Sequence, residues 1–328
     1  MQYEEVGKLI RGVGGLYEIA LQAGETPLSG QSVTARAKGN FRHEGVKPLV
    51  GDTVRVSFDE SALGRDEAGN ARSFADGGGI VIEEILPRKN ALIRPPMANL
   101  DYLFITFAAA HPAPSLETVD KLISIAEYND IEPVIVIGKC DVAPEYAEEL
   151  QKAYTVSGFS AFLLSATTGK GVAELRQFMD TNLPGKTAAF AGASGVGKST
   201  LLNALFPDLS LQTGEISRRI ERGKHTTRRV ELYSVGASCS FYIADTPGFS
   251  MLDFVRFEFF TRDDLPCTMR EFAPYIGQCR YKKCTHTREE GCAILEAVRQ
   301  GAIPQSRHQS FVSMFDALKN KHEWSHKT

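Results

Sequence analysis

The eight residues from Gly192 to Ser199 have the pattern G-x-x-x-x-G-K-[ST], which binds the phosphates of a nucleotide. Glycines let the backbone wrap around phosphate oxygens, so that successive N–H groups and the N-terminus of the following helix face negative charge. In this interpretation Lys198 reaches the β- and γ-phosphates, and the Ser199 hydroxyl binds Mg²⁺. The predicted nucleotide-binding residues of this loop are Gly192, Ala193, Ser194, Gly195, Val196, Gly197, Lys198, Ser199 and Thr200.

The residues on both sides of this loop predict the strand, loop and helix that the motif requires. An apolar strand is predicted over 187–191 and a helix over 198–206. A Gly- and Ser-rich turn without function is the alternative interpretation. The flanking pattern argues against it.

Further polar residues downstream of the loop could complete a phosphate and magnesium site. Asp245 follows an apolar run and is predicted to end a strand, where its carboxylate can hold Mg²⁺ through water. The Gly248 N–H can then contact the γ-phosphate. Asp-Thr-Pro-Gly alone is most often a turn, but the strand before it and its position after Lys198 favour a functional role. Thr227, in the pair Thr226-Thr227, is the second predicted Mg²⁺ ligand.

Residues that could select the base come before the phosphate loop. An apolar strand over 133–137 is predicted to bring Asp141 to the sheet edge where ligands bind. Its carboxylate can accept hydrogen bonds from guanine N1–H and N2, which adenine lacks, and each lost bond to a charged group costs about 1.5–3 kcal/mol. Lys139 would lie against the base or support the phosphate loop. The predicted base-binding residues are Gly138, Lys139, Cys140, Asp141, Ser165 and Ala166.

The base-binding motifs are weak when each is taken alone. Lys-x-Asp after a strand is often a surface turn, and Ser165-Ala166 simply follows a short apolar strand, where its N–H groups could face the guanine carbonyl. Ordinary GTPases carry these motifs after the phosphate loop, so their order in this chain is rotated. Several motifs in a rotated order rarely occur together by chance. Residues 182–186 would connect the conventional last helix to the conventional first strand, which is feasible because the ends of compact domains often lie close together.

Three of the six cysteines cluster with a histidine in the pattern Cys279-x4-Cys284-x-His286-x5-Cys292. Three thiolates and one imidazole supply the four ligands of a closed, structural Zn²⁺ site, which would fold the segment rather than catalyse a reaction. A disulfide is the alternative, and a reducing compartment disfavours it. The remaining cysteines are predicted to be small buried or turn residues: Cys140, Cys239 and Cys267.

The chain of 328 residues is predicted to contain several domains. Residues 1–88 alternate β-rich runs with Gly turns, which is typical of an OB-type β-barrel. Residues 61–79 resemble a long flexible hairpin loop, and 89–98 a linker. The strands of the barrel are predicted over 8–10, 16–21, 32–36, 52–57 and 80–85. Its basic residues are Arg36, Lys38, Arg42, Lys47 and Arg55.

Residues 99–256 alternate strand and helix, which predicts a doubly wound α/β sheet holding the circularly permuted P-loop GTPase motifs. The predicted strands are 100–108, 133–137, 161–164, 187–191 and two near 230–235 and 239–244; the helices are 115–129, 145–155, 171–180 and 198–206. Residues 257–328 are predicted to form a mostly helical zinc-binding domain. Apolar stripes at 292–299 and 310–318 have helical spacing and are assigned to its core.

The net charge of −3 argues against a generally polycationic nucleic-acid binder. Residues 267–328 nevertheless hold ten basic and six acidic side chains, a surplus of +4. Six basic residues also surround the Thr pair, opposed only by Glu221: Arg218, Arg219, Arg222, Lys224, Arg228 and Arg229. Such a run is usually a solvated surface, but in a loop that contacts the γ-phosphate it fits an RNA contact.

The N-terminus carries charged residues and no apolar core of a signal peptide. The apolar run 102–110 is too short to cross a bilayer. We therefore expect a cytoplasmic protein. Nothing in the sequence demands more than a monomer.

Over essentially its whole length the chain resembles the RsgA (YjeQ) family of circularly permuted ribosome-assembly GTPases. The resemblance is carried by the phosphate loop and by the segments 48–52, 223–227, 245–249 and 274–292. It implies a GTPase that acts late in maturation of the small ribosomal subunit and is stimulated by that subunit. It also implies that the barrel and the zinc domain contact ribosomal RNA.

Two features affect the expected chemistry. The family commonly has Asn or Thr where this chain has Gly138, and the lost side-chain hydrogen bond would cost about 1 kcal/mol of nucleotide affinity. Phe249 stands where many GTPases have a water-orienting Gln, a feature shared with the family. Intrinsic hydrolysis should therefore be slow, ~10⁻³ s⁻¹ or below. On the ribosomal particle, His225 could approach the attacking water; a solvent-exposed loop histidine is the alternative.

Two other classes of function remain open at this stage. An ATP-dependent enzyme could use the same phosphate loop, although Asp141 argues for guanine. An RNA-binding scaffold could retain the nucleotide without hydrolysing it. Nucleotide preference and turnover with small subunits would distinguish these classes.

Overall fold

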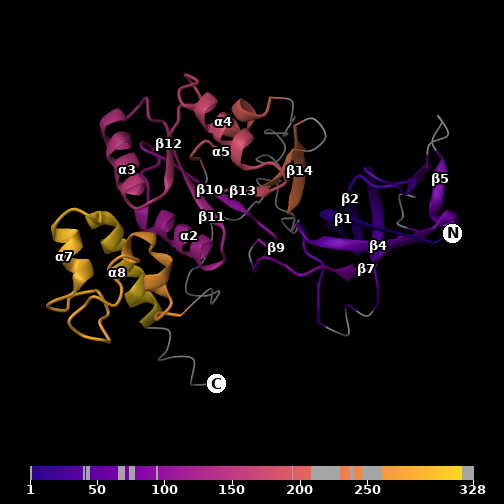
Figure 1. Cartoon of the computed structure of the whole chain (residues 1–328). Helices are drawn as coiled ribbons and strands as arrows, with labels where there is room; N and C mark the ends of the chain where they lie inside the picture. Colours follow the sequence, from indigo (N-terminus) through magenta and orange to yellow (C-terminus); the bar gives the residue numbers. More distant parts are fainter. Residues whose placement is uncertain are drawn as a thin grey trace, which may run out of the picture. The chain divides into compact units, whose positions relative to one another are not determined.

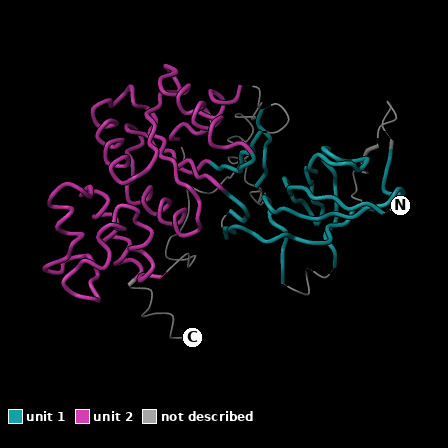
Figure 2. Tube along the Cα trace, in the orientation of Figure 1, with its two compact units in different colours: residues 1–100, 185–189, 227–248 teal, residues 101–184, 190–226, 249–328 magenta. Residues whose placement is uncertain are grey.

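The computed structural model describes residues 2–39, 41, 45–65, 71–73, 78–93, 95–193, 195–207, 230–236, 240–245 and 261–319 (Figure 1). The chain divides into two compact units (Figure 2). Residues 1–100, 185–189 and 227–248 form unit 1, and residues 101–184, 190–226 and 249–328 form unit 2.

A closed barrel of five strands forms the N-terminal part of unit 1 (Figure 1). Its strands are β1 (Gln2–Val13), β2 (Leu16–Leu21), β3 (Ser32–Ala37), β4 (Thr53–Asp59) and β7 (Val81–Ile85). β1 pairs with both β2 and β4, β2 with β3, β3 with β7, and β7 with β4, so the pairing returns to β1. Closure removes the open edges that a five-stranded sheet would otherwise expose. The predicted OB-type barrel is confirmed.

A tight turn before β4 explains the residue types at 48–52. Gly51 has a φ of +92°, and a Cβ there would come 2.0 Å from the carbonyl oxygen of Ala98. The buried carboxylate of Asp52 accepts hydrogen bonds from the Leu49 N–H and from Arg88 Nε, both at 2.7 Å. The turn therefore requires glycine and an acid at these two positions.

Two segments predicted to lack regular structure contain short strands. After a 3₁₀ turn, η1 (Glu60–Ala62), β5 (Leu63–Arg65) pairs with β6 (Ala71–Ser73) in the segment expected to be a flexible loop. In the expected linker, β8 (Ala91–Leu92) pairs with β9 (Met97–Ala98). Leu92 and Met97 are buried, so this segment contributes to the apolar core of unit 1.

Two members of the basic set predicted on the barrel are paired with acids. Lys38 Nζ lies 2.6 Å from Glu83, and Arg55 Nε lies 3.1 Å from Glu84, both across to β7. The sequence does not reveal these pairs, because neighbouring strands bring together residues that are 45 and 29 positions apart. The positive field on this part of the barrel is correspondingly reduced.

The remaining strands of unit 1 lie close to their predicted positions. They are β13 (Thr187–Ala191), whose last two residues belong to unit 2, β14 (Glu231–Val235) and β15 (Phe241–Asp245). β15 is parallel to β13 and antiparallel to β14. β14 in turn pairs with β1, and Lys8 Nζ donates to Thr187 Oγ1 at 2.8 Å. These contacts join the barrel to β13, the strand before the phosphate loop, and to β14, a strand after it.

Unit 2 contains a parallel sheet made of β10 (Tyr102–Ala108), β11 (Glu132–Gly138) and β12 (Ser160–Leu163). The helices between and after these strands are α2 (Leu116–Tyr128), α3 (Pro144–Val156), α4 (Val172–Asn182) and α5 (Lys198–Leu205). All of them begin within two residues of their predicted positions. The three parallel strands are almost fully apolar, because strands covered on both faces of a sheet are buried.

Aromatic contacts show which helix covers which face of this sheet. Phe178 of α4 packs against Phe104 and Phe162 on one face. Tyr154 of α3 packs against Phe107, whose side chain points to the opposite face because it is three residues from Phe104. Helices thus cover both faces, which confirms the doubly wound α/β prediction.

The C-terminal part of unit 2 is helical, as predicted. It comprises η3 (Leu265–Thr268), η4 (Arg270–Phe272), α7 (Ala293–Arg299) and α8 (Gln305–Lys319). Phe272 and Phe311 form its core, with ring centroids 4.9 Å apart, and α8 packs against α2 (Figure 1). Among the described residues, no helix has the length and apolarity needed to cross a bilayer.

Candidate functional site

The residues predicted to bind the base follow strands that end at one edge of the unit 2 sheet. β10 and β11 run parallel with Ala108 beside Gly138, and β12 continues the sheet next to β11. The loops after β11 and β12 are joined directly, because the Cys140 N–H donates to the Leu164 carbonyl oxygen at 3.2 Å. Parallel strands thus bring Asp141 and Ser165 to the carboxyl-terminal edge, where ligands bind in such sheets.

The phosphate loop has the glycine-dependent backbone that its sequence predicts. Gly192 has a φ of +146°, and a Cβ there would come 2.0 Å from the Thr106 carbonyl oxygen of β10. Gly195 and Gly197 have φ angles of +79° and +98°, and Gly197 caps the N-terminus of α5. Non-glycine residues adopt these angles rarely. The loop therefore presents a helix N-terminus, which favours anionic ligands.

The lysine of the loop points back into it. Lys198 Nζ donates to the carbonyl oxygens of Gly192 and Ala193 at 2.6 and 2.7 Å. Burial lowers the pKa of this ammonium from its usual value. A phosphate in the loop would offer the ammonium anionic acceptors and would favour its charged form.

The base loop and the phosphate loop lie side by side. A Cβ on Gly138 would lie 3.6 Å from the carbonyl oxygen of Val196 and 3.6 Å from that of Phe107. Gly138 and Val196 are far apart in sequence and adjacent in space. The base loop and the phosphate loop, whose order in the sequence is rotated, thus meet at one edge of the sheet in unit 2.

The remaining base-recognition residues follow from this arrangement. Asp141 is exposed, whereas Cys140 is buried at 1% exposure. Lys139 has a φ of +56°, and its ammonium donates to the His111 carbonyl oxygen. The buried Ser165 donates its N–H to the Lys170 carbonyl oxygen at 3.0 Å, and its hydroxyl accepts from the Thr168 N–H at 3.2 Å. These bonds fix the loop that carries Ala166.

Several predicted residues lie outside the part of the chain that the structure describes: Ser194, Arg218, Arg219, Glu221, Arg222, Lys224, His225, Thr226, Thr227, Arg228, Arg229, Cys239, Gly248 and Phe249. Of the other magnesium candidates, Ser199 stands in the first turn of α5 and Asp245 is the last residue of β15. Both backbone positions agree with the strand and helix expected from the sequence.

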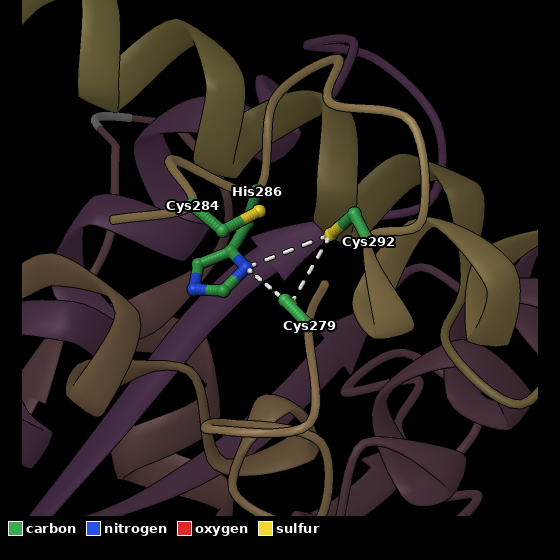
Figure 3. A group of neighbouring side chains, drawn as sticks. All are labelled: Cys279, Cys284, His286 and Cys292. Atoms are coloured by element: carbon green, nitrogen blue, oxygen red, sulfur yellow. Dashed lines mark hydrogen bonds between the residues drawn. The ribbon is translucent and has the colours of Figure 1, made fainter. Parts of the chain in front are cut away.

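The second candidate site is the cysteine and histidine cluster near the C-terminus (Figure 3). The ligand atoms of Cys279, Cys284, His286 and Cys292 all lie within 4.8 Å of one another. The described cysteines of the cluster are free thiols in this structure. His286 has a φ of +61°, which non-glycine residues rarely adopt, and its ring faces the thiols (Figure 3).

The distances within the cluster fit a tetrahedral metal ion. His286 Nδ1 lies 3.5 Å from Cys279 Sγ and 3.6 Å from Cys292 Sγ, and these two sulfur atoms are 3.8 Å apart (Figure 3). Tetrahedral zinc, with usual bond lengths, would place its sulfur ligands ~3.8 Å apart and its sulfur and nitrogen ligands ~3.6 Å apart. Cys279, His286 and Cys292 could therefore bind a metal ion without moving, with Cys284 as the fourth ligand.

Burial keeps the ligand side chains of the cluster uncharged while no metal ion is bound. Burial raises the pKa of the Cys284 thiol to about 12 and also raises that of Cys292. Burial lowers the pKa of His286, which favours the neutral imidazole that binds metals. A divalent cation would release the thiol protons on binding, because only thiolates are strong ligands.

One residue that the sequence motifs do not reveal organises this metal-binding segment. Glu289 accepts hydrogen bonds from the Thr285 N–H at 2.8 Å, from the Thr285 hydroxyl, and from the Thr287 and Arg288 N–H groups at 3.2 and 3.1 Å. These bonds lower its pKa to about 2, against the opposing effect of burial. An acid three residues after a metal-binding histidine could have indicated such a loop-fixing role.

A buried ion cluster between the helical C-terminal segment and α2 was also missed. Arg307 is 1% exposed, and its guanidinium donates to Glu271 Oε1 at 2.7 Å and to Asp120 Oδ1 at 2.5 Å. Tyr154 donates to the same Asp120 oxygen at 3.2 Å. Burial raises the pKa of Asp120, opposed by Arg307. The cluster ties α8 to both α2 and α3.

The sequence of this chain matches known protein families that have the same arrangement of domains. Residues 85–255 match the family described as RsgA GTPase, and residues 6–65 match the RsgA N-terminal domain. The chain is also similar along its length to proteins named small ribosomal subunit biogenesis GTPase RsgA. The protein of this name from Agathobacter rectalis is 37% identical, and the match covers 97% of this chain and 99% of the relative. That of Caldanaerobacter subterraneus subsp. tengcongensis is 37% identical, with 98% of both chains covered.

Two solved structures share the fold. The crystal structure of YjeQ from Thermotoga maritima has a TM-score of 0.74 at 30% identity, covering 97% of this chain and 99% of that one. The structure of YloQ, described as a circularly permuted GTPase, has a TM-score of 0.72 at 29% identity, covering 97% and 96%. The barrel, the permuted nucleotide-binding unit and the sequence matches lead to one conclusion. The chain belongs to the RsgA GTPase family, and it hydrolyses GTP.

Proposed function

We propose that this GTPase acts late in maturation of the small ribosomal subunit and that the subunit stimulates a slow intrinsic hydrolysis. The names of its relatives, small ribosomal subunit biogenesis GTPases, support the choice of partner. The observation that carries the nucleotide site is the proximity of two distant loops, with Gly138 beside the carbonyl oxygen of Val196. Base and phosphate recognition would thereby act on one bound molecule.

Each polar residue of the site has a proposed role in this reaction. Lys198 neutralises the β- and γ-phosphates, and the N–H groups of the loop and of α5 bind their oxygens. Ser199 and Thr227 would hold Mg²⁺, with the Asp245 carboxylate holding it through water, and the Gly248 N–H would contact the γ-phosphate. When bound there, Mg²⁺ would supply positive charge to the phosphate oxygens.

Guanine recognition rests on the loops after β11 and β12. Asp141 accepts from guanine N1–H and N2, and Lys139 lies along the base. Because the Ser165 N–H already donates to Lys170, we assign the guanine carbonyl to the Ala166 N–H. The fixed Ser165 turn supports this assignment.

The catalytic group is proposed to come from the segment around the Thr pair. Phe249 cannot orient water, so hydrolysis by the free protein should be slow. On the ribosomal particle, His225 would orient the attacking water. A His225→Ala variant should then lose subunit-stimulated hydrolysis while it retains GTP binding; full stimulated turnover would remove His225 from the mechanism.

We assign zinc to the Cys279, Cys284, His286 and Cys292 cluster, because three thiols and an imidazole suit zinc and the distances match its tetrahedron. With four protein ligands the site has no open position, so its role is structural. The proposed domains are a barrel over 1–88, a connecting segment over 89–98, the GTPase domain over 99–256 and the zinc domain over 257–328. We propose that the protein works as a monomer in the cytoplasm, where ribosomal subunits are assembled.

The test of the proposed function is GTP hydrolysis by the zinc-loaded protein, measured with and without purified small ribosomal subunits. Hydrolysis should rise by orders of magnitude with small subunits and stay at the intrinsic rate with large subunits. The Ser199→Ala variant, which lacks the Mg²⁺-binding hydroxyl, should remain slow in both. Equal rates with small, large or no subunits would reject the coupling.

A further inference from the structure

A lysine of the barrel reaches two strands that lie outside it. Lys8 stands on β1 between Gly7 and Leu9, which are both buried, so its side chain faces out of the barrel. Its Nζ donates to Thr187 Oγ1 at 2.8 Å and lies 5.1 Å from the centroid of the Tyr242 ring, within the range of a cation–π interaction. Lys8 therefore contacts both β13 and β15.

The two partners of Lys8 are neighbours in the sheet. Thr187 and Tyr242 are register partners in the parallel pairing of β13 with β15, which among the described residues covers three pairs. Thr187 is 0% exposed. A hydrogen bond from a charged donor is stronger where water is excluded, so the bond to Thr187 is worth more than an exposed one. Lys8 thus joins the two strands at the first pair of a short ladder.

Both strands lead directly to residues with proposed roles at the phosphates. β13 ends at Ala191, and the phosphate loop begins at the next residue, Gly192. β15 ends at Asp245, three residues after Tyr242. Because each residue of a strand advances the chain by a fixed length, a contact that fixes the first pair of two parallel strands also fixes the positions of the residues that follow. The Lys8 contact therefore helps to set where Asp245 stands along β13.

A second contact made by β1 is more exposed. β1 pairs with β14 at Arg11 and Glu231, whose side chains are 49% and 36% exposed and whose closest charged atoms are 3.7 Å apart. Glu231 in turn is the register partner of Asp245 on β15. An exposed ion pair at this distance contributes little to holding the strands. Lys8, with its buried acceptor, is therefore the stronger of the two side-chain contacts.

The chemistry of magnesium makes the position of Asp245 important. Mg²⁺ demands near-ideal octahedral geometry, with oxygen ligands at about 2.0–2.1 Å. A misplacement of about 1 Å in a reacting site costs on the order of 100-fold in rate. The base-binding residues, in contrast, follow other strands, β11 and β12. A side chain that holds β15 in place should therefore affect the Mg²⁺-dependent part of GTP binding and leave base recognition intact.

We infer that Lys8 is a positioning residue for GTP hydrolysis: from the barrel it holds β15, and with it the backbone of Asp245, against β13. This inference deepens the proposed function and rests on the role proposed there for Asp245. The barrel thereby contributes to the reaction of the free protein, in the absence of any ribosomal particle.

The experiment measures the affinity of the full-length, zinc-loaded protein for a fluorescent, non-hydrolysable GTP analogue, with Mg²⁺ and in Mg²⁺-free buffer. Lys8→Met keeps the apolar stem and removes the donor. The ratio of the two affinities should then fall roughly tenfold, the effect of one charge-assisted hydrogen bond, while the affinity without Mg²⁺ stays unchanged. The intrinsic kcat should fall in parallel. Lys8→Arg retains a charged donor and should behave as the parent protein does.

Matched variants separate this contact from a general effect on the barrel. Lys38→Met removes another barrel lysine, 48% exposed and paired with Glu83, and should change neither affinity. Thr187→Val removes the acceptor of the Lys8 bond and tests the contact even if Lys8→Met folds poorly. Because both variants break the same bond, the Lys8→Met/Thr187→Val double variant should lose no more than either single variant.

The outcomes distinguish this inference from the proposed function. An unchanged ratio in Lys8→Met would overturn the inference, as would additive losses in the double variant. Equal losses with and without Mg²⁺ would indicate a general structural role and would also overturn it. Asp245→Asn tests the proposed role of Asp245 separately: if it lowers the ratio and Lys8→Met does not, the inference alone fails. If Asp245→Asn leaves the ratio unchanged, the proposed role of Asp245 fails as well.

Discussion

Gly138 lies beside Val196: a Cβ on the glycine would stand 3.6 Å from the valine carbonyl oxygen. The glycine is the last residue of β11, directly before the base loop, and the valine belongs to the phosphate loop before α5. The distance is an ordinary van der Waals contact, so a side chain at position 138 can be accommodated. A polar side chain at this position could also form a hydrogen bond that links the two loops.

Gly138→Asn should therefore tighten GTP binding about fivefold. The amide of asparagine could donate to the Val196 or Phe107 carbonyl oxygen, and a net hydrogen bond is worth about 1 kcal/mol. Isothermal titration with GTP gives the comparison, and Gly138→Ala, which adds only the Cβ, is the control. Equal GTP affinity of the asparagine and alanine variants would show that the amide forms no stabilising hydrogen bond.

Two glycines of the phosphate loop should respond differently to alanine. Gly192→Ala would place its Cβ 2.0 Å from the Thr106 carbonyl oxygen, so it should destabilise the protein by about 3 kcal/mol or more. Gly195→Ala meets nothing within 4 Å and should cost only the strain of its positive φ, about 1–2 kcal/mol. Urea unfolding without nucleotide measures both. Equal losses would show that the close approach to Thr106 has no energetic effect.

Removal of the metal should unfold the C-terminal metal-binding segment. The purified protein should contain one zinc per chain, and a strong chelator should lower the melting temperature, because metal binding stabilises the folded form. Cys284→Ser should lose the metal, whereas Cys267→Ser, which changes an exposed cysteine outside the cluster, should retain it. Elemental analysis of both variants provides the check; full zinc in Cys284→Ser would contradict the four-ligand assignment.

The buried cluster around Arg307 should make a large contribution to stability. Arg307→Met leaves Asp120 and Glu271 buried without their cation, which should cost about 3–5 kcal/mol. Arg299→Met breaks an ion pair whose arginine is 65% exposed, and its effect should stay within about 0.5 kcal/mol. Chemical unfolding compares the two. A small effect of Arg307→Met would mean that the acids become neutral at little cost.

The strands and helices of unit 2 could be predicted because their residues follow simple periods. Parallel strands such as Val134–Ile137 are continuous apolar runs, and the helices between them carry one apolar stripe. The metal ligands were equally accessible, since cysteine and histidine at this spacing have few other uses in a reduced protein. In both cases the decisive information is local in sequence.

The features that the sequence did not predict depend on distant partners. β8 and β9 are two residues long and exist because each pairs with the other and is covered by unit 1. Arg307 looks like a solvated residue of a polar helix turn, and its partner Asp120 is 187 residues away. Likewise, Lys38 looks free to bind nucleic acid until the fold brings Glu83 to it. Only the tertiary structure supplies these neighbours.

The guanine specificity of Asp141 tests the central claim most directly, since it requires the displaced base loop to act on a nucleotide held by the phosphate loop. Asp141→Asn removes the charged acceptor of N1–H and N2 and adds an amide donor that suits the C2 oxygen of xanthine. Binding of GTP should weaken about 100-fold or more, and XTP should bind with an affinity near that of GTP for the parent protein. Unchanged GTP binding by Asp141→Asn, with no gain for XTP, would contradict the account.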